Sequence, residues 1–238
     1  MNFSANKNIE SLNNPEYKFL VSLKKNRNRK SSNKSISEGF RECYKLLDSN
    51  YEIDTLYFCS DLFIGENNKD LLDECEQENI RIVKVSEKVF KAMSYRDRPD
   101  GFIAVFNTRD LSLPDKINGP ILIPDQIEKP GNLGTMIRTA KSFGINNIFL
   151  SDEITDIFNP NVIRASVGHV FNMNIWSSSN KKIRDFLNSN NYQILLLDPE
   201  GEESLENFKP ENNFAVVVGA EQYGISNEWF ENEYVALS

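Results

Sequence analysis

The sequence predicts an α/β protein built from two domains. Short apolar runs alternate with segments of helical period, a pattern typical of sheets covered by helices. The chain of 238 residues is longer than an ordinary single domain, and its 39% hydrophobic and 26% charged residues provide for a core and exclude general disorder. The stretch 107–119, NTRDLSLPDKING, is rich in Asn, Asp, Pro and Ser and interrupts the alternation. We therefore expect a first domain at 1–106, a linker at 107–119 and a second domain at 120–238.

The first domain is expected to begin with a helix from Asn14 whose apolar residues Phe19, Leu20 and Leu23 point inward. A second helix carries apolar residues at helical spacing, namely Phe40, Cys43, Tyr44 and Leu47. Strands and helices then alternate, with strands expected at Ile53–Cys59, Ile80–Val85 and Phe102–Phe106 and helices at Asp70–Glu78 and Glu87–Met93. This order predicts a small α/β domain.

A basic stretch interrupts the first domain. No acidic residue occurs between Lys18 and Lys34, although the whole chain has a formal net charge of −8. That net charge argues against coating of nucleic acid by bulk electrostatics, whereas the local cluster fits an RNA contact. The composition of residues 25–35 also fits a mobile, solvated basic loop, so both interpretations stay open. Arg96 and Arg98 pose the same choice between contacting RNA and pairing with Asp97 and Asp100.

The second domain is expected to contain a central, mostly parallel sheet, because its strands are short and largely apolar. These strands are Ile121–Ile123, Ile148–Leu150, Asn174–Trp176, Ile194–Leu197, Ala215–Val218 and Tyr234–Leu237. Neither the dinucleotide fingerprint G-x-G-x-x-G nor the phosphate loop G-x-x-x-x-G-K-[ST] is present, which argues against a Rossmann cofactor site and a P-loop NTPase.

The stretch 125–150, DQIEKPGNLGTMIRTAKSFGINNIFL, organises the second domain. Pro130 and Gly131 break the chain after an apolar strand, and Asn132 stands where it would cap a helix. The helix should bury one apolar stripe and end at Gly144, with Arg138 on the other side. The expected stripe consists of Leu133, Met136, Ile137, Ala140 and Phe143.

Three segments of the second domain carry a family resemblance. PGNLGTMIRTAKSFG at 130–144 resembles the first signature motif of the SpoU (TrmH-like) family of RNA ribose 2′-O-methyltransferases, members of the SPOUT superfamily. NPNVIRASVG at 159–168 resembles the segment between that family's motifs, and VVGAEQYGIS at 217–226 resembles its second motif. The resemblance implies a SPOUT-type parallel sheet with a trefoil knot, and a small ribosomal-protein-like α/β domain in front of it that selects the RNA.

The resemblance also implies the reaction and its residues. The reaction is methylation of a ribose 2′-hydroxyl in tRNA or rRNA, with S-adenosylmethionine as the methyl donor and no metal. The implied catalytic residues are Arg138, Asn132 and Glu221, with Glu221 orienting Asn132 or Arg138. The implied cofactor-binding residues are Leu197, Val218, Gly219, Ala220, Gly224 and Ile225. The residues expected to contact RNA, from the basic stretch and the resemblance together, are Lys24, Lys25, Arg27, Arg29, Arg41, Arg164 and Ser166, with local capping as the alternative for Arg164 and Ser166.

The family's third motif is not found before the sequence ends at Ser238. The sequence is therefore expected to be a fragment of a longer chain or a truncated form with an incomplete knot and cofactor site. This leaves a non-catalytic RNA-binding homologue as the alternative function, and an unrelated nucleotide-binding α/β enzyme as a third. The completed protein is expected to be a homodimer.

Three further expectations concern cysteine, histidine and location. Cys43, Cys59 and Cys75 lack paired spacing and indicate reduced core thiols, not a disulfide framework or a zinc site. His169, the single histidine, is expected to have a structural role. No apolar run approaches the roughly 20 residues needed to span a bilayer, and the N-terminus lacks the features of a secretory signal, so we expect a cytoplasmic protein with no membrane contact.

Overall fold

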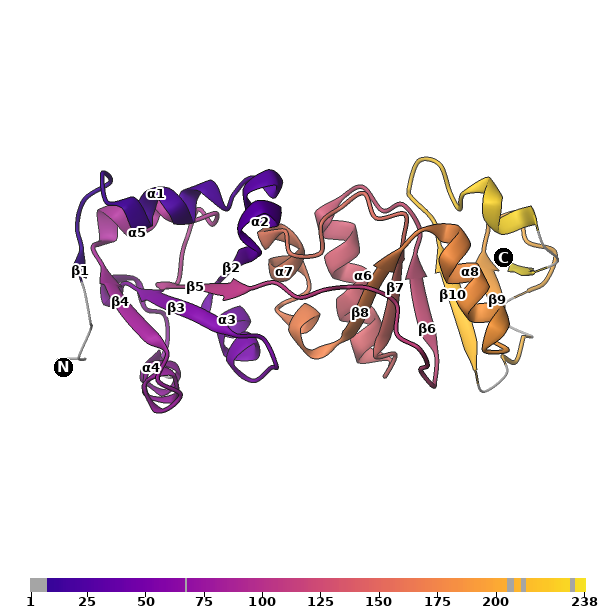
Figure 1. Ribbon diagram of the computed structural model, residues 1–238, viewed down its shortest axis with the longest axis horizontal. Coiled ribbons are helices and arrows are strands. Elements are labelled where there is room, and N and C mark those ends of the chain that lie inside the picture. Colours follow the sequence, from indigo (N-terminus) through magenta and orange to yellow (C-terminus); the bar gives the residue numbers. More distant parts are fainter. Residues whose placement is uncertain (1–7, 67, 205–207, 211–212, 232–233) are drawn as a thin grey trace. The chain divides into compact units, whose positions relative to one another are not determined.

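The computed structural model describes residues 8–66, 68–204, 208–210, 213–231 and 234–238 (Figure 1). The chain forms two compact units. The first contains Met1–Arg109 and Phe158–Asn172, and the second contains Asp110–Ile157 and Met173–Ser238. Residues 158–172 thus group with the first unit, although the sequence alone placed them in the second domain.

The first unit contains a five-stranded mixed sheet in the order β1-β4-β3-β5-β2. Its strands are β1 (Asn8–Ile9), β2 (Lys34–Glu38), β3 (Ile53–Phe58), β4 (Arg81–Val85) and β5 (Phe102–Asn107). β4 runs parallel to β1 and β3, whereas β5 runs antiparallel to β2 and β3. The three strands predicted from apolar runs are confirmed within two residues, while β1 and β2 were not expected.

Helices cover both faces of this sheet. Figure 1 shows α1 (Pro15–Ser22) and α5 (Glu87–Met93) on one face, and α3 (Phe40–Leu47) and α4 (Asn68–Gln77) on the other. Leu20, Leu23 and Phe90 are fully buried in one core cluster with apolar residues of all five strands. The remaining elements of the unit are α2 (Asn26–Ser32), η1 (Ser60–Leu62), α7 (Pro160–Ala165) and η2 (His169–Asn172). The inward positions predicted for Leu20 and Leu23 are confirmed, whereas Phe19 is partly exposed.

Residues 25–35 of the basic stretch form α2 and the start of β2, so the prediction of a mobile loop there is wrong. Within it, the Arg29 guanidinium donates from Nη1 to the carbonyl oxygens of Leu23 and Lys24, at 2.9 and 3.2 Å. Those carbonyls lie just past α1, where the helix leaves acceptors without partners. Arg29 is only 3% exposed and therefore fixes the turn between α1 and α2.

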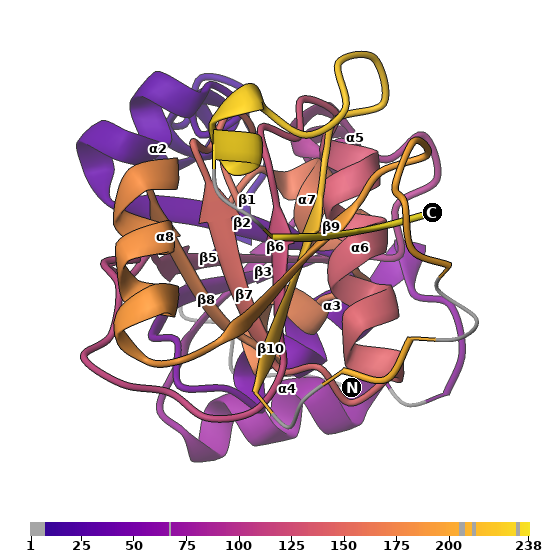
Figure 2. The same ribbon diagram turned by 90° about the vertical axis from the view of Figure 1, so that its right-hand side faces the viewer.

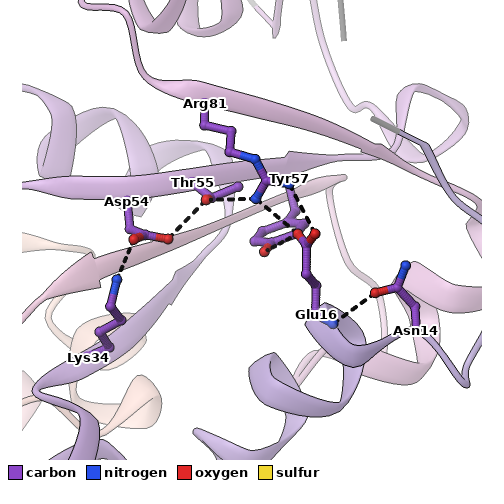
Figure 3. A network of polar contacts seen from close by, with 7 residues as sticks. All are labelled: Asn14, Glu16, Lys34, Asp54, Thr55, Tyr57 and Arg81. Atoms are coloured by element: carbon purple, nitrogen blue, oxygen red, sulfur yellow. Dashed lines mark hydrogen bonds and ion pairs between the residues drawn. The ribbon is translucent and has the colours of Figure 1, made fainter. Parts of the chain in front are cut away.

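Glu16 joins α1 to the sheet of the first unit (Figure 3). Its carboxylate accepts two hydrogen bonds from Arg81, both at 3.0 Å, and one from the Tyr57 hydroxyl at 3.1 Å. Asn14 caps α1 by accepting the N–H of Glu16. Burial first, and then the neighbouring Glu16 carboxylate, raise the pKa of Tyr57 to about 12. Lys34, the last cation of the basic stretch, pairs with Asp54 on β3.

Arg96 forms the second polar centre of the first unit. Its Nη2 lies 2.6 Å from Glu42 Oε1 and donates to the Glu38 carbonyl oxygen at 2.8 Å, while its Nη1 lies 3.4 Å from Asp100 Oδ2. Burial by itself would lower the pKa of Arg96, but Glu42 and Asp100 raise it. Gly39 has φ +111°, and a Cβ there would lie 2.3 Å from Arg96 Nη2. Pairing rather than RNA contact is therefore the correct interpretation of Arg96, with Glu42 as a partner that the sequence did not indicate.

The second unit contains a parallel six-stranded sheet in the order β11-β9-β10-β6-β7-β8. Its strands are β6 (Ile121–Pro124), β7 (Asn147–Ser151), β8 (Asn174–Ser178), β9 (Gln193–Leu197), β10 (Phe214–Val218) and β11 (Val235–Leu237). Figure 2 shows this sheet between α6 (Pro130–Ser142) on one side and α8 (Asn180–Ser189) on the other. A short helix, η4 (Asn227–Glu231), precedes β11. The predicted α/β class and the mostly parallel sheet are confirmed.

Helix α6 departs from its prediction at its start and at Phe143. It begins at Pro130 with Lys129 at the N-cap position, so Asn132 lies inside the first turn and does not cap the helix. Leu133, Ile137 and Ala140 are buried as expected. Phe143 is 81% exposed because it follows the last helical residue. Gly144 has φ +76°, which confirms it as the residue that ends the helix.

The three cysteines are free and buried, and burial raises the pKa of the Cys75 thiol to about 12. They are core thiols, as predicted. None of the helices in the described part of the chain is long and apolar enough to cross a membrane.

Candidate active site

The carboxyl ends of three neighbouring strands in the second unit form the candidate site. Val218 of β10 lies opposite Leu197 of β9 on one side and Pro124 of β6 on the other. All three strands are parallel, so the loops that follow them leave the same edge of the sheet. In open parallel sheets, ligands bind at this edge.

The loop after β10, residues 219–226, is a tight hairpin that we call the motif-two loop. Ala220 and Gly224 exchange two backbone hydrogen bonds, of 3.0 and 2.9 Å. A Cβ at Gly219 would lie 2.0 Å from the carbonyl carbon of Gly224, so only glycine fits at this position. The hairpin leaves Glu221, Gln222 and Tyr223 exposed at its tip.

Glu221 connects this hairpin to the start of α6. Its carboxylate forms an ion pair with Lys129, which stands at the N-cap position of α6, three residues before Asn132. Lys129 first, and then Asn132, lower the pKa of Glu221 below the usual carboxyl value. The hypothesis that Glu221 orients Asn132 stays a prediction, which the effect of Asn132 on the pKa of Glu221 supports. Lys129 was not singled out, although it directly precedes the motif.

Arg138 lies two turns along α6, on the exposed face with Thr135 and Ser142. Six residues separate it from Asn132, which corresponds to about 9 Å along the helix axis. Among the described residues, no side chain or carbonyl makes a hydrogen bond or ion pair with its guanidinium. The structure thus joins Glu221 to the start of α6 through Lys129, while Arg138 is exposed and has no such partner among the described residues.

The six residues expected to bind the cofactor lie at the ends of β9 and β10 and in the motif-two loop. Leu197 is 36% exposed, and Val218, Gly219, Ala220 and Gly224 are each at least partly exposed. Ile225 is only 8% exposed and packs in the core cluster with Trp229 and Leu187. Its side chain therefore faces away from the edge, and only its backbone remains for a ligand.

A buried residue that the sequence did not single out connects these loops. Asp125 follows β6 directly and is fully buried, and its carboxylate accepts hydrogen bonds from the Ser151 hydroxyl and from the backbone N–H of Ser226. A charged residue at the end of an apolar strand is the only signal in the sequence that would have indicated it.

The residues expected to contact RNA belong to the first unit and differ in availability. Lys25, Arg27, Arg41 and Arg164 are exposed. Lys24 donates to the Ser94 carbonyl at 2.8 Å, and burial lowers its pKa, against the effect of Glu38. Arg29 is buried as described above. Ser166 is fully buried and donates to the Ile163 carbonyl at 2.9 Å, so its role is local capping. Neither Arg29 nor Ser166 can contact RNA in this conformation.

Comparison with known families assigns both parts of the chain. The SpoU rRNA Methylase family matches residues 119–237, and an MRM3-like substrate binding domain matches residues 14–104. The chain is 26% identical over 235 residues to the 23S rRNA (guanosine(2553)-2'-O)-methyltransferase RlmP of Bacillus subtilis (strain 168), across 97% of this chain and 91% of that protein. It is 28% identical over 205 residues to the mitochondrial rRNA methyltransferase 3 of Xenopus laevis, across 82% of this chain and 45% of that protein.

Solved structures show the same fold. An RNA 2'-O ribose methyltransferase crystal structure matches with a TM-score of 0.81 and 27% identity, covering 97% of this chain and 89% of that one. The AdoMet-bound rRNA methyltransferase from Sinorhizobium meliloti matches with a TM-score of 0.83 at 24% identity, covering 97% of this chain and 87% of that one. The chain therefore belongs to the SpoU rRNA methylase family and carries an MRM3-like substrate-binding domain in front of the methylase domain.

Proposed function

We propose that this RNA 2′-O-methyltransferase transfers the methyl group of S-adenosylmethionine to a ribose 2′-hydroxyl of ribosomal RNA. The observation that carries the proposal is the ion pair of Glu221 with Lys129, which brings the motif-two loop to the start of α6 at the carboxyl edge of the parallel sheet, two helical turns from the exposed Arg138. The relatives named above act on rRNA, which favours rRNA over tRNA as the substrate.

The residues at the sheet edge fit S-adenosylmethionine. Leu197 and Val218 offer partly exposed apolar side chains to a flat base, and Gly219 and Gly224 have no side chain to obstruct it. The cofactor supplies an activated methyl group on a sulfonium. The protein then needs to hold the donor, align the 2′-oxygen behind the methyl carbon and exclude water.

Alignment is the main task of the protein in this reaction, because the methyl donor is already activated. Effective molarities from correct alignment can reach about 10⁵ M or more. Asn132 is held by Glu221 at the start of α6, so its amide has a fixed direction toward the substrate. We assign Asn132 to ribose or phosphate contact and Glu221 to holding Asn132.

Arg138 stabilises charge in the proposed mechanism. A guanidinium keeps its protons at any pH at which the protein is folded, so Arg138 donates hydrogen bonds and does not act as the general base. Its planar fork fits a phosphate together with the oxygen that loses its proton. We therefore assign Arg138 to stabilising the negative charge that develops on the 2′-oxygen, and another group removes the proton.

RNA selection is assigned to the exposed cations of the first unit. Lys25 stands at the N-cap position of α2, and Arg27 lies on α2, Arg41 on α3 and Arg164 on α7. Each is exposed, so each can neutralise a phosphate without breaking a contact inside the protein.

We further propose a homodimer that works in the cytoplasm. In the second unit, Phe143, Ile154 and Tyr223 are largely exposed, and a two-fold interface would cover such apolar surface. The similarity to the 23S rRNA methyltransferase of Bacillus subtilis supports the cytoplasmic assignment. Light scattering coupled to size exclusion measures the mass, and a monomeric mass at assay concentration would contradict the dimer.

Methyl transfer to isolated RNA tests the reaction. The chain is incubated with methyl-labelled S-adenosylmethionine and either rRNA or tRNA, and the RNA is digested to nucleosides for mass spectrometry. We expect a 2′-O-methylnucleoside from rRNA only. Label on a base, or label on tRNA alone, would contradict the proposal, and calorimetric titration with S-adenosylmethionine, ATP and NAD identifies the cofactor independently.

A further inference from the structure

Asp125 is attached to both ends of the motif-two loop. Its backbone N–H donates to the carbonyl oxygen of Val218, the last residue before the loop, at 2.9 Å. Its carboxylate Oδ2 accepts the backbone N–H of Ser226, the last residue of the loop, also at 2.9 Å. One residue at the end of β6 therefore closes the base of the loop that carries Glu221.

The direction of the Asp125 carboxylate is fixed by a third contact. Its Oδ1 accepts the Ser151 hydroxyl at 2.6 Å, and the backbone N–H of Gln126 donates to the Ser151 carbonyl at 3.0 Å. Asp125 and Ser151 are both buried, so water does not compete for these hydrogen bonds. A carboxylate suits this place because both neighbours are donors and each of its oxygens accepts one of them.

The loop after β6 and the motif-two loop are thus linked twice. Asp125 binds Ser226 at the base, and Lys129 pairs with Glu221 at the tip. Asp125 and Lys129 belong to one loop, while Ser226 and Glu221 belong to the other. Release of the base would leave the tip of the hairpin free to move away from the start of α6, because the tip is exposed and only side chains hold it.

We propose that Asp125 is a positioning residue for methyl transfer, which acts by fixing the motif-two loop so that Glu221 holds Asn132. This inference rests on the proposed function of Glu221 and Asn132. Asp125 is buried and does not contact substrate or cofactor itself. Its contribution therefore passes through Glu221, and this route distinguishes it from a buried residue that only stabilises the fold.

A double-mutant cycle on the full chain tests the inference. A shift of about 1 Å in a positioning group can cost about 10²-fold in rate, so Asp125→Ala should lower kcat by that order in the wild-type background. In a Glu221→Gln background, the same change should cost much less, because the ion pair between Glu221 and Lys129, through which Asp125 acts, is already broken. An equal fold-loss of kcat in the two backgrounds would overturn the inference, since removal of a residue with a general structural role lowers activity independently of Glu221.

Two further variants guard against a folding defect. Asp125→Asn keeps an acceptor for the Ser226 N–H and places its amide against the Ser151 hydroxyl, so this variant should retain most of the activity. A loss of activity as large as that of Asp125→Ala would overturn the inference. If Asp125→Ala does not fold, Ser151→Ala replaces it in the double-mutant cycle. The inference would then be overturned by a wild-type rate for Ser151→Ala, or by equal fold-losses of kcat in the wild-type and Glu221→Gln backgrounds. Asp152→Ala is the control, because it removes a carboxylate contact of the same kind, to the N–H of Asn180 at the start of α8.

The side-chain amide of Asn132 gives a readout that does not depend on activity. Its NMR resonances should shift in Asp125→Ala toward those of Glu221→Gln. Absence of methyl transfer by the wild-type chain would refute the proposed function, whereas unshifted Asn132 resonances in a folded Asp125→Ala chain would refute the positioning role.

Discussion

Three arginines of the first unit and Arg138 of the second unit differ in what their guanidinium groups contact. Arg29 donates to two carbonyl oxygens, Arg81 pairs with Glu16, and Arg96 lies against Glu42 and Asp100. Arg138 makes no such contact with any described residue and stands exposed on α6. A guanidinium whose donors are satisfied inside the protein contributes to the fold, whereas one with free donors can bind a ligand.

This difference explains why positive charge alone is a poor guide to RNA contact. The basic stretch contains seven cations between Lys18 and Lys34. The structure commits Arg29 to a turn and Lys34 to Asp54, and it partly commits Lys24 to Ser94. Lys25 and Arg27 stay exposed and carry the RNA hypothesis for this segment.

The largest effect is expected when a committed arginine is removed. Arg96→Met should lower the free energy of unfolding of the first unit by about 3 kcal/mol, because it leaves the buried Glu42 without its cation. Urea denaturation measures the loss, and Arg98→Met, which changes an exposed arginine two residues away, is the control. If both variants are equally stable, Arg96 is not structural and the comparison fails.

A smaller effect is expected in RNA binding. Lys25→Ser with Arg27→Ser should weaken RNA affinity and reduce the slope of log K against log salt by about 2, one for each phosphate that is no longer neutralised. Lys69→Ser with Lys88→Ser removes the same charge from α4 and α5 and serves as the control. Equal salt slopes for the two double variants would show that the start of α2 does not bind phosphate.

The smallest effect concerns pH. The pKa of Glu221 is lowered, first by Lys129 and then by Asn132, so the ion pair is complete above the usual carboxyl pKa and is disrupted as the pH falls through the lowered value. Activity between pH 6 and 8 should therefore show no titration of Glu221, a window well above the usual value of about 4.3. In Lys129→Ala the pKa of Glu221, followed by NMR, should move back toward that value, whereas Lys141→Ala should leave it unchanged. An unchanged pKa in Lys129→Ala would contradict the ion pair.

Local patterns predicted most of the fold. The apolar runs of both units gave strand positions within about two residues, because buried strands need continuous apolar side chains. Gly144 marked the end of α6, because a positive φ favours glycine. The α2 helix was missed because its composition resembles a loop, and the contact that fixes it runs from Arg29 back to the end of α1.

The site was predictable only as far as motifs reached. Asn132 and Glu221 came from the family resemblance, and their contact required the fold, since 89 positions of sequence separate them. Asp125 could not be recognised from its neighbours, because its partners Ser151, at the end of β7, and Ser226, in the motif-two loop, are distant in the sequence. The grouping of residues 158–172 with the first unit depends on tertiary packing in the same way.

Single-turnover methyl transfer by Arg138→Ala tests the central claim most directly. At saturating RNA and S-adenosylmethionine, the rate should fall by at least about 10²-fold, the scale of removing one transition-state interaction, while stability changes by only about 0.5 kcal/mol as at an exposed site. Arg138→Lys should not restore the rate, because an ammonium lacks the planar fork. Thr139→Ala, an exposed change at the next position of α6, should leave the rate unchanged. A near-normal rate for Arg138→Ala would show that this arginine is only a surface residue and would contradict the proposed mechanism.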